Sequence, residues 1–80
     1  MRVRYVGGSF GVDELTNGKV YECIGIEAFP EFTLLRIIDD SEEDYLYPAN
    51  NPRPFDRSSP GGRWEIVEDD ENGSLAKVIK

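Results

Sequence analysis

Hydrophobic and polar residues alternate over short segments of this chain, a pattern typical of β-strands. The segments are rich in β-branched and aromatic residues, and most are bounded by glycine or proline, which disfavours helices. Five strands are predicted, at residues 2–6, 20–27, 32–38, 44–47 and 63–67. The pattern therefore predicts an all-β fold.

The segment 32–38 is the most apolar part of the chain. With a period of two, Phe32, Leu34 and Ile38 fall on one face of a strand. Leu35 and Ile37 fall on the other face. Two apolar faces indicate a central strand that is covered on both sides, as in a small barrel or a tight sandwich.

Two Asn-Gly pairs predict turns. Asn72-Gly73 favours a type I′ hairpin, because both central residues of that turn need positive φ. The resulting register pairs Val67 with Val78 and places two glutamates opposite lysines. We therefore expect a C-terminal hairpin. The other pair, Asn17-Gly18, is interpreted as the turn that leads into the second strand.

Residues 48–62 hold four of the five prolines, together with pairs of asparagine, serine and glycine. A connection this long without a strand is unusual in a chain of 80 residues, and such loops are usually functional or disordered. We expect Phe55 to pack against the rest of the protein while its neighbours stay mobile. The length of the chain predicts a single domain, residues 1–80.

The charge balance narrows the range of partners. Sixteen acidic residues against nine basic ones give a net charge of -7, which argues against direct binding of nucleic acid. No apolar run is long enough for a membrane-spanning helix. The one cysteine cannot form an internal disulfide. We expect a monomeric cytoplasmic protein that does not bind membranes.

Catalysis is not expected from these residues. The chain has no histidine, the commonest general base and metal ligand. The nearest basic residue to Cys23 in the sequence is Lys19, so nothing close in the sequence stabilises a thiolate. The acidic runs 39–44 and 68–71 lack the ligand spacing of a calcium loop. The sequence therefore predicts no enzyme activity, no cofactor and no metal site.

Tyr45 and Tyr47 share one face of a predicted strand, and Pro48 follows them directly. Tyrosines beside a proline and near acidic residues can form a shallow groove for a peptide that contains proline or arginine. Packing in the core is the alternative role for these rings, and the sequence leaves both open.

The segment Asp13–Ile24 resembles the first long loop and second strand of Src homology 3-like barrels. Tyr45-Leu46-Tyr47-Pro48 resembles the strand and proline before their short 3₁₀ turn. The similarity is closer still to small uncharacterised bacterial and phage domains with this barrel. It implies a barrel of five or six strands that acts as a non-catalytic module for binding a protein or peptide. The aromatic pattern and the resemblance together predict a binding site made of Tyr5, Asp13, Glu14, Tyr45, Tyr47, Pro48 and Trp64.

The alternative function is an acidic decoy, which occupies a basic nucleic-acid-binding site on a partner protein. Nine of the 16 acids lie in the runs 39–44 and 68–71, which would mimic phosphates. Decoy binding weakens steeply with salt, whereas peptide binding on the tyrosines does not. The same runs leave the effect of acid on stability open. If the carboxylates repel one another in the folded protein, acidification stabilises the protein. If they are paired with cations, acidification destabilises it.

Overall fold

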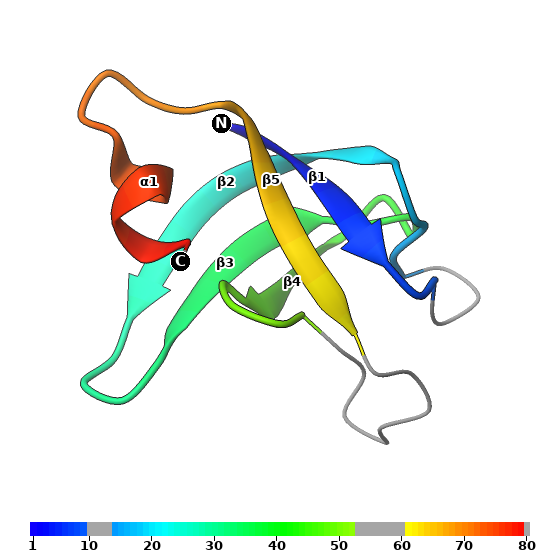
Figure 1. Ribbon diagram of the computed structural model, residues 1–80, viewed down its shortest axis with the longest axis horizontal. Coiled ribbons are helices and arrows are strands. Elements are labelled where there is room, and N and C mark those ends of the chain that lie inside the picture. Colours follow the sequence, from blue (N-terminus) through cyan, green and yellow to red (C-terminus); the bar gives the residue numbers. More distant parts are fainter. Residues whose placement is uncertain (10–13, 53–60, 80) are drawn as a thin grey trace.

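The protein is mostly antiparallel β-sheet, as the alternating pattern predicts. The computed structural model describes residues 1–9, 14–52 and 61–79. Its elements are β1 (Arg2–Gly7), β2 (Val20–Ala28), β3 (Thr33–Ile38), β4 (Asp44–Pro48), β5 (Gly62–Glu68) and α1 (Ser74–Val78). All five predicted strands are confirmed, and each of their ends agrees to within one residue. Figure 1 shows the strands with α1 at the C-terminal end of the described chain.

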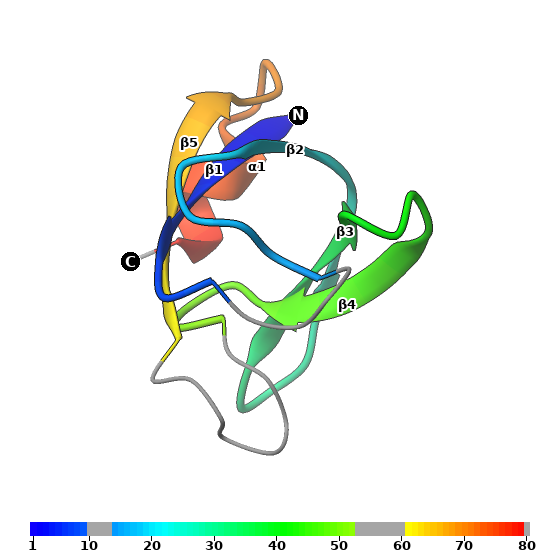
Figure 2. The same ribbon diagram turned by 90° about the vertical axis from the view of Figure 1, so that its right-hand side faces the viewer.

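The five strands form one sheet in the order β4-β3-β2-β1-β5. Consecutive strands pair from β1 to β4, and β5 returns to pair with β1. The sheet curls, so that β1 and β5 face β3 and β4 across the interior (Figure 2). The strands β4 and β5 remain edges, so the sheet is not closed into a barrel by strand pairing.

Side-chain contacts and α1 bridge the two edges of the sheet. The indole Nε1 of Trp64 on β5 donates a hydrogen bond of 3.0 Å to the carbonyl oxygen of Pro48 on β4. The amide of Asn50 donates to the carbonyl oxygen of Val78, also at 3.0 Å. Leu75 of α1 is completely buried. The core is therefore covered between the edges without a strand-to-strand ladder.

The expected C-terminal hairpin is wrong, because residues 74–78 form α1. Gly73 has positive φ as expected, but the chain then turns into a helix that Asp69 and Asp70 hold at its start. The Asp69 carboxylate accepts hydrogen bonds from the backbone N–H groups of Leu75 (2.9 Å) and Ala76 (3.0 Å). These bonds satisfy N–H groups that a helix start leaves free. Burial of Leu75 outweighs the exposed charge pairs of the hairpin, since such pairs contribute little.

Aromatic rings fill much of the core. Trp64 lies edge-on to Tyr5, Tyr21 and Tyr47, with ring centroids 5.7, 6.3 and 6.4 Å away. Edge-to-face contacts of this kind are favourable beyond the area they bury. The buried hydrophobic residues are Val3, Tyr5, Leu15, Tyr21, Cys23, Leu35, Ile37, Tyr47, Ala49, Trp64 and Leu75.

Strand β3 is covered on one face only. Leu35 and Ile37 are buried, as predicted for the core face. On the other face, Leu34 and Ile38 are half-buried, and Phe32 just before the strand is 54% exposed. The expectation of two covered faces is therefore wrong. The outer side of β2, β3 and β4 keeps apolar surface in contact with solvent.

Glycines allow β1 and β5 to approach closely where Gly7 lies opposite Gly62. A Cβ atom on Gly62 would lie 2.2 Å from the carbonyl oxygen of Val6, and one on Gly7 would lie 2.5 Å from the Cα atom of Gly62. No side chain fits at either position, so both glycines are needed for this pairing.

Candidate functional site

Three of the predicted binding residues come together, but inside the core. Tyr5, Tyr47 and Trp64 are only 0%, 6% and 3% exposed. The hydroxyl of Tyr47 donates a hydrogen bond of 2.6 Å to the buried carboxylate of Asp39. Burial and this bond raise the pKa of Tyr47 far above its ordinary value. These rings support the sheet, and they offer little surface to a ligand.

The other predicted binding residues are dispersed. Glu14 and Pro48 are half-buried, and Asp13 lies outside the described residues. Tyr45 is 50% exposed, although it shares a side of β4 with the buried Tyr47. Of the predicted tyrosines, only Tyr45 therefore presents its ring to solvent.

Tyr45 borders a hollow at one end of the sheet. This hollow has a volume of about 420 Å³ and is open to solvent. Its lining comes from β2, from β3, and from the β3–β4 turn with the start of β4. The lining residues are Ile24, Ile38, Glu42, Glu43, Asp44 and Tyr45. We call this feature the Tyr45 hollow.

A β-bulge in β2 supplies the most exposed apolar side chain of the hollow. Cys23 pairs with Ile37 and Gly25 pairs with Arg36, so Ile24 is an extra residue without a partner on β3. Its side chain is 54% exposed. The sequence analysis missed Ile24, but Gly25 inside a strand is the kind of signal that marks a bulge.

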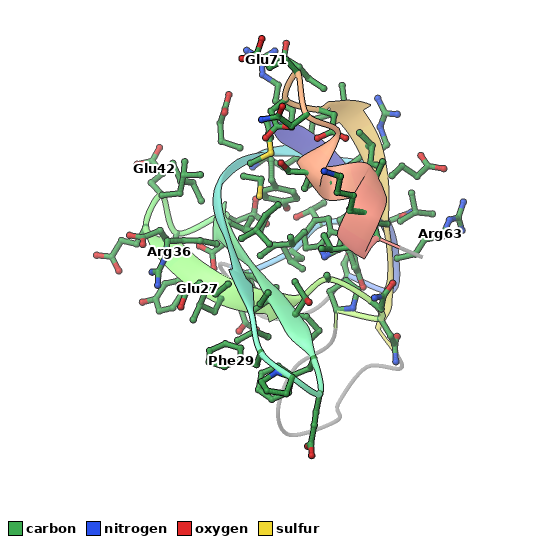
Figure 3. The ribbon with its side chains drawn as sticks, turned by 90° about the vertical axis from the view of Figure 1, so that its left-hand side faces the viewer. Glu27, Phe29, Arg36, Glu42, Arg63 and Glu71 are labelled. Carbon is green, nitrogen blue, oxygen red and sulfur yellow. The ribbon has the colours of Figure 1, made fainter. Side chains whose placement is uncertain are left out.

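The β3–β4 turn fixes the position of Glu42 at the edge of the hollow. The N–H of Glu42 donates to the carbonyl oxygen of Asp39 at 3.0 Å, and the N–H of Asp39 donates to that of Glu43 at 3.1 Å. Glu42 has a φ of 67°, a left-handed conformation that glycine or asparagine adopts more easily. Figure 3 shows Glu42 on the outer side of this turn, on the opposite side of the molecule from Arg63.

The charges around the hollow are unequally compensated. Arg36 pairs with Asp44 at 2.8 Å and with Glu27 at 2.5 Å, which lowers the pKa of Asp44 and raises that of Arg36. Glu43 accepts a hydrogen bond of 3.1 Å from the Tyr45 hydroxyl, and this bond raises the pKa of Tyr45. Within residues 1–9, 14–52 and 61–79, no cation pairs with Glu42 or Glu43.

Much of the remaining acidic charge has a structural role. Asp40 accepts hydrogen bonds from Lys19 (2.5 Å), Thr16 (2.7 Å) and Tyr21 (3.0 Å). Partial burial acts to raise the pKa of Asp40, but these bonds lower it overall. They tie the β3–β4 turn to the predicted turn at Gly18, which is confirmed by a φ of 83°. Asp39, Asp44, Asp69 and Asp70 are also engaged inside the fold.

Comparisons with protein-family models, curated proteins and solved structures found no match to this chain. The described part of the chain contains no group of three acidic or cysteine side chains arranged to hold a metal ion. Its helical residues are too few to form a membrane-spanning helix. The Tyr45 hollow is therefore interpreted from its own residues.

Proposed function

We propose that this protein is a non-catalytic module that binds a partner protein or peptide at the Tyr45 hollow. The observation that carries the proposal is the exposure of Ile24 and Tyr45, 54% and 50%, on the lining of one concave feature. Single exposed apolar residues are common on protein surfaces. Two of them in one hollow provide the kind of pocket in which a partner's anchoring side chain is buried.

We also propose that the fold belongs to the Src homology 3-like class. The support is a curled sheet of five antiparallel strands in which β1 lies between β2 and β5. The resemblance of Asp13–Ile24 and Tyr45–Pro48 to such domains points in the same direction. In this proposal the contact between Trp64 and Pro48 takes the place of strand pairing between the edges.

The acidic decoy is the second candidate, and its support is weaker. Five of the nine acids in the two runs hold turns, ion pairs or the start of α1. A carboxylate that is engaged in this way cannot leave its partner without a cost to the fold. The acids that remain for a basic partner are Glu42, Glu43, Glu68 and Glu71. Four carboxylates make a small phosphate mimic.

Selection from a random peptide library on the immobilised protein, followed by NMR titration, tests the proposed function. We expect selected peptides to shift the amide signals of Ile24, Ile38 and Tyr45. Ile24→Ser is expected to weaken binding by about tenfold, since burial of such a side chain contributes about 1.5–3 kcal/mol. The matched control is Val20→Ser, which changes an exposed residue of the same strand and is expected to leave binding unchanged.

Three outcomes would contradict the proposed function. The first is that no peptide is selected. The second is that Ile24→Ser and Val20→Ser weaken binding equally. The third is that the shifts centre on residues 68–71 and disappear as salt is added, which would instead support the decoy.

A further inference from the structure

We infer that the occupant of the Tyr45 hollow is a positively charged segment of a partner protein, in which a lysine or arginine lies beside an aliphatic residue. This inference rests on the proposed function and names the chemistry of its partner. It depends on the combination of spare negative charge and exposed apolar surface in one hollow.

The negative charge at the hollow is available to a partner. Arg36, which pairs with Asp44 of the hollow, is also held by Glu27. Lys19 is within the electrostatic influence of Glu42, but its ammonium group is bound to Asp40 at 2.5 Å. An incoming cation would therefore reach Glu42 and Glu43 without displacing a cation that belongs to the described residues. The net charge of -7 also favours the approach of a basic partner.

The apolar lining favours a long amphipathic side chain over a small cation. Lysine and arginine bury an aliphatic stem while their charged end stays near water or a carboxylate. Ile24 and Ile38 offer surface for such a stem or for a neighbouring aliphatic residue. The exposed ring of Tyr45 lies beside the carboxylates and can receive the cation on its face.

The same features disfavour other segments. An acidic segment would be repelled by Glu42, Glu43 and Asp44. A wholly apolar segment would remove water from these carboxylates without replacing its hydrogen bonds, which is costly. A basic and aliphatic segment satisfies both parts of the lining.

The test measures binding of two short fluorescent peptides to the full chain by anisotropy and by NMR. One peptide alternates lysine with leucine, and the other alternates glutamine with leucine. We expect the lysine–leucine peptide to bind more tightly than the glutamine–leucine peptide. We also expect it to shift the NMR signals of the residues that line the hollow. Glu42→Gln is expected to weaken it by about two- to fivefold, as for a partly exposed charge pair. Ile24→Ser is expected to weaken both peptides.

The matched control is Glu71→Gln, which removes the same charge from an exposed position outside the hollow. Figure 3 shows Glu71 beside the loop before α1 and Glu42 at the β3–β4 turn. Equal weakening by Glu71→Gln and Glu42→Gln would overturn the inference, because the peptide would then respond only to total charge. Equal affinity of the two peptides for the hollow would overturn it while leaving the proposed function intact. Failure of both peptides, and of every library peptide, would overturn both.

Discussion

The indole of Trp64 and the carbonyl group of Pro48 connect the two edges of the sheet through one hydrogen bond of 3.0 Å. Trp64 belongs to β5 and Pro48 to β4. These two edge strands do not pair with each other. The same indole is the ring on which Tyr5, Tyr21 and Tyr47 pack. One side chain thus both fills the core and links the two edges of the sheet.

Trp64→Phe removes the N–H donor and part of the ring volume while keeping an aromatic side chain. We expect a loss of about 2–4 kcal/mol in the free energy of unfolding, from the unpaired carbonyl group and the cavity. Urea denaturation followed by circular dichroism measures it. Tyr45→Phe, which changes an exposed aromatic residue, is the control and should keep the wild-type midpoint. Equal midpoints for both variants would show that the bond to Pro48 does not hold the edges.

The close contact of β1 and β5 gives a second prediction. In Gly62→Ala the new Cβ atom meets the Val6 carbonyl oxygen at 2.2 Å, so we expect a loss of about 3 kcal/mol or more. Gly18→Ala is the comparison, because Gly18 has a φ of 83° and no atom within 4 Å of a new Cβ. Its cost is conformational only, about 1–2 kcal/mol. Thermal denaturation of both variants should show the larger loss for Gly62→Ala, and the reverse order would contradict the close approach.

The strands were predictable because alternation and bounding glycines or prolines are local signals. The glycine pair at 7 and 62 was not recognised as a contact, because it joins residues far apart in the sequence. The burial of Tyr5, Tyr47 and Trp64 was equally hidden, since the sequence does not show which face of a strand the curled sheet encloses. For the same reason, the candidate site is the Tyr45 hollow, which β2, β3, β4 and the β3–β4 turn line, and not these buried rings.

The prediction of a C-terminal hairpin was wrong for a different physical reason. Asn72-Gly73 is a strong local hairpin signal, but Asp69 and Asp70 compete by accepting the N–H groups at the start of α1. Leu75 then reaches the core, which no pairing rule could indicate. Among the residues that line the hollow, Tyr45 alone belongs to the predicted peptide-binding site, and the acidic residues were predicted only as part of the decoy. Ile24 was missed because a bulge exposes it.

Asp69→Ala tests this account of the C-terminal segment. The substitution removes the acceptor for the N–H groups of Leu75 and Ala76, so we expect the melting temperature to fall by roughly 4–8 °C, as for loss of a helix cap. Glu71→Ala is the control, because its exposed side chain accepts none of these bonds. If the two variants have the same melting temperature, Asp69 does not hold α1.

Acid is expected to destabilise the protein. Hydrogen bonds lower the pKa values of Asp40, Asp69 and Asp70 against the opposing effect of desolvation, and Arg36 lowers that of Asp44. A carboxyl group whose pKa is depressed by folding contributes stability above its unfolded pKa of about 4. That contribution is lost as the pH falls through the folded pKa. The structure thus favours paired over repelling carboxylates.

Urea midpoints at about pH 7, 5 and 3 measure this dependence. We expect little change between pH 7 and 5 and a decrease from pH 5 to 3. Asp40→Asn should flatten that decrease, whereas Glu31→Gln, at the exposed β2–β3 turn, should not. A midpoint that rises on acidification would show that repulsion within the acidic runs outweighs their pairing.

Glu42 occupies a backbone position that asparagine would occupy at lower cost. Its φ of 67° costs about 1 kcal/mol for a residue with an ordinary side chain, and asparagine adopts this region more readily. We therefore expect Glu42→Asn to raise the free energy of unfolding by about 0.5–1 kcal/mol. The same variant lacks the carboxylate at the hollow, so its affinity for the lysine–leucine peptide should fall by about two- to fivefold.

Opposite changes in stability and affinity are the expected signature of a residue kept for binding at the expense of the fold. Urea denaturation and peptide titration of one protein sample measure both quantities. Glu71→Asn is the matched control, since it makes the same chemical change at a residue without positive φ, and neither quantity should change. If Glu42→Asn gains stability and retains full affinity, the carboxylate of Glu42 has no part in recognition. If it loses stability, the left-handed turn does not strain Glu42, and the opposition between folding and binding at this position does not exist.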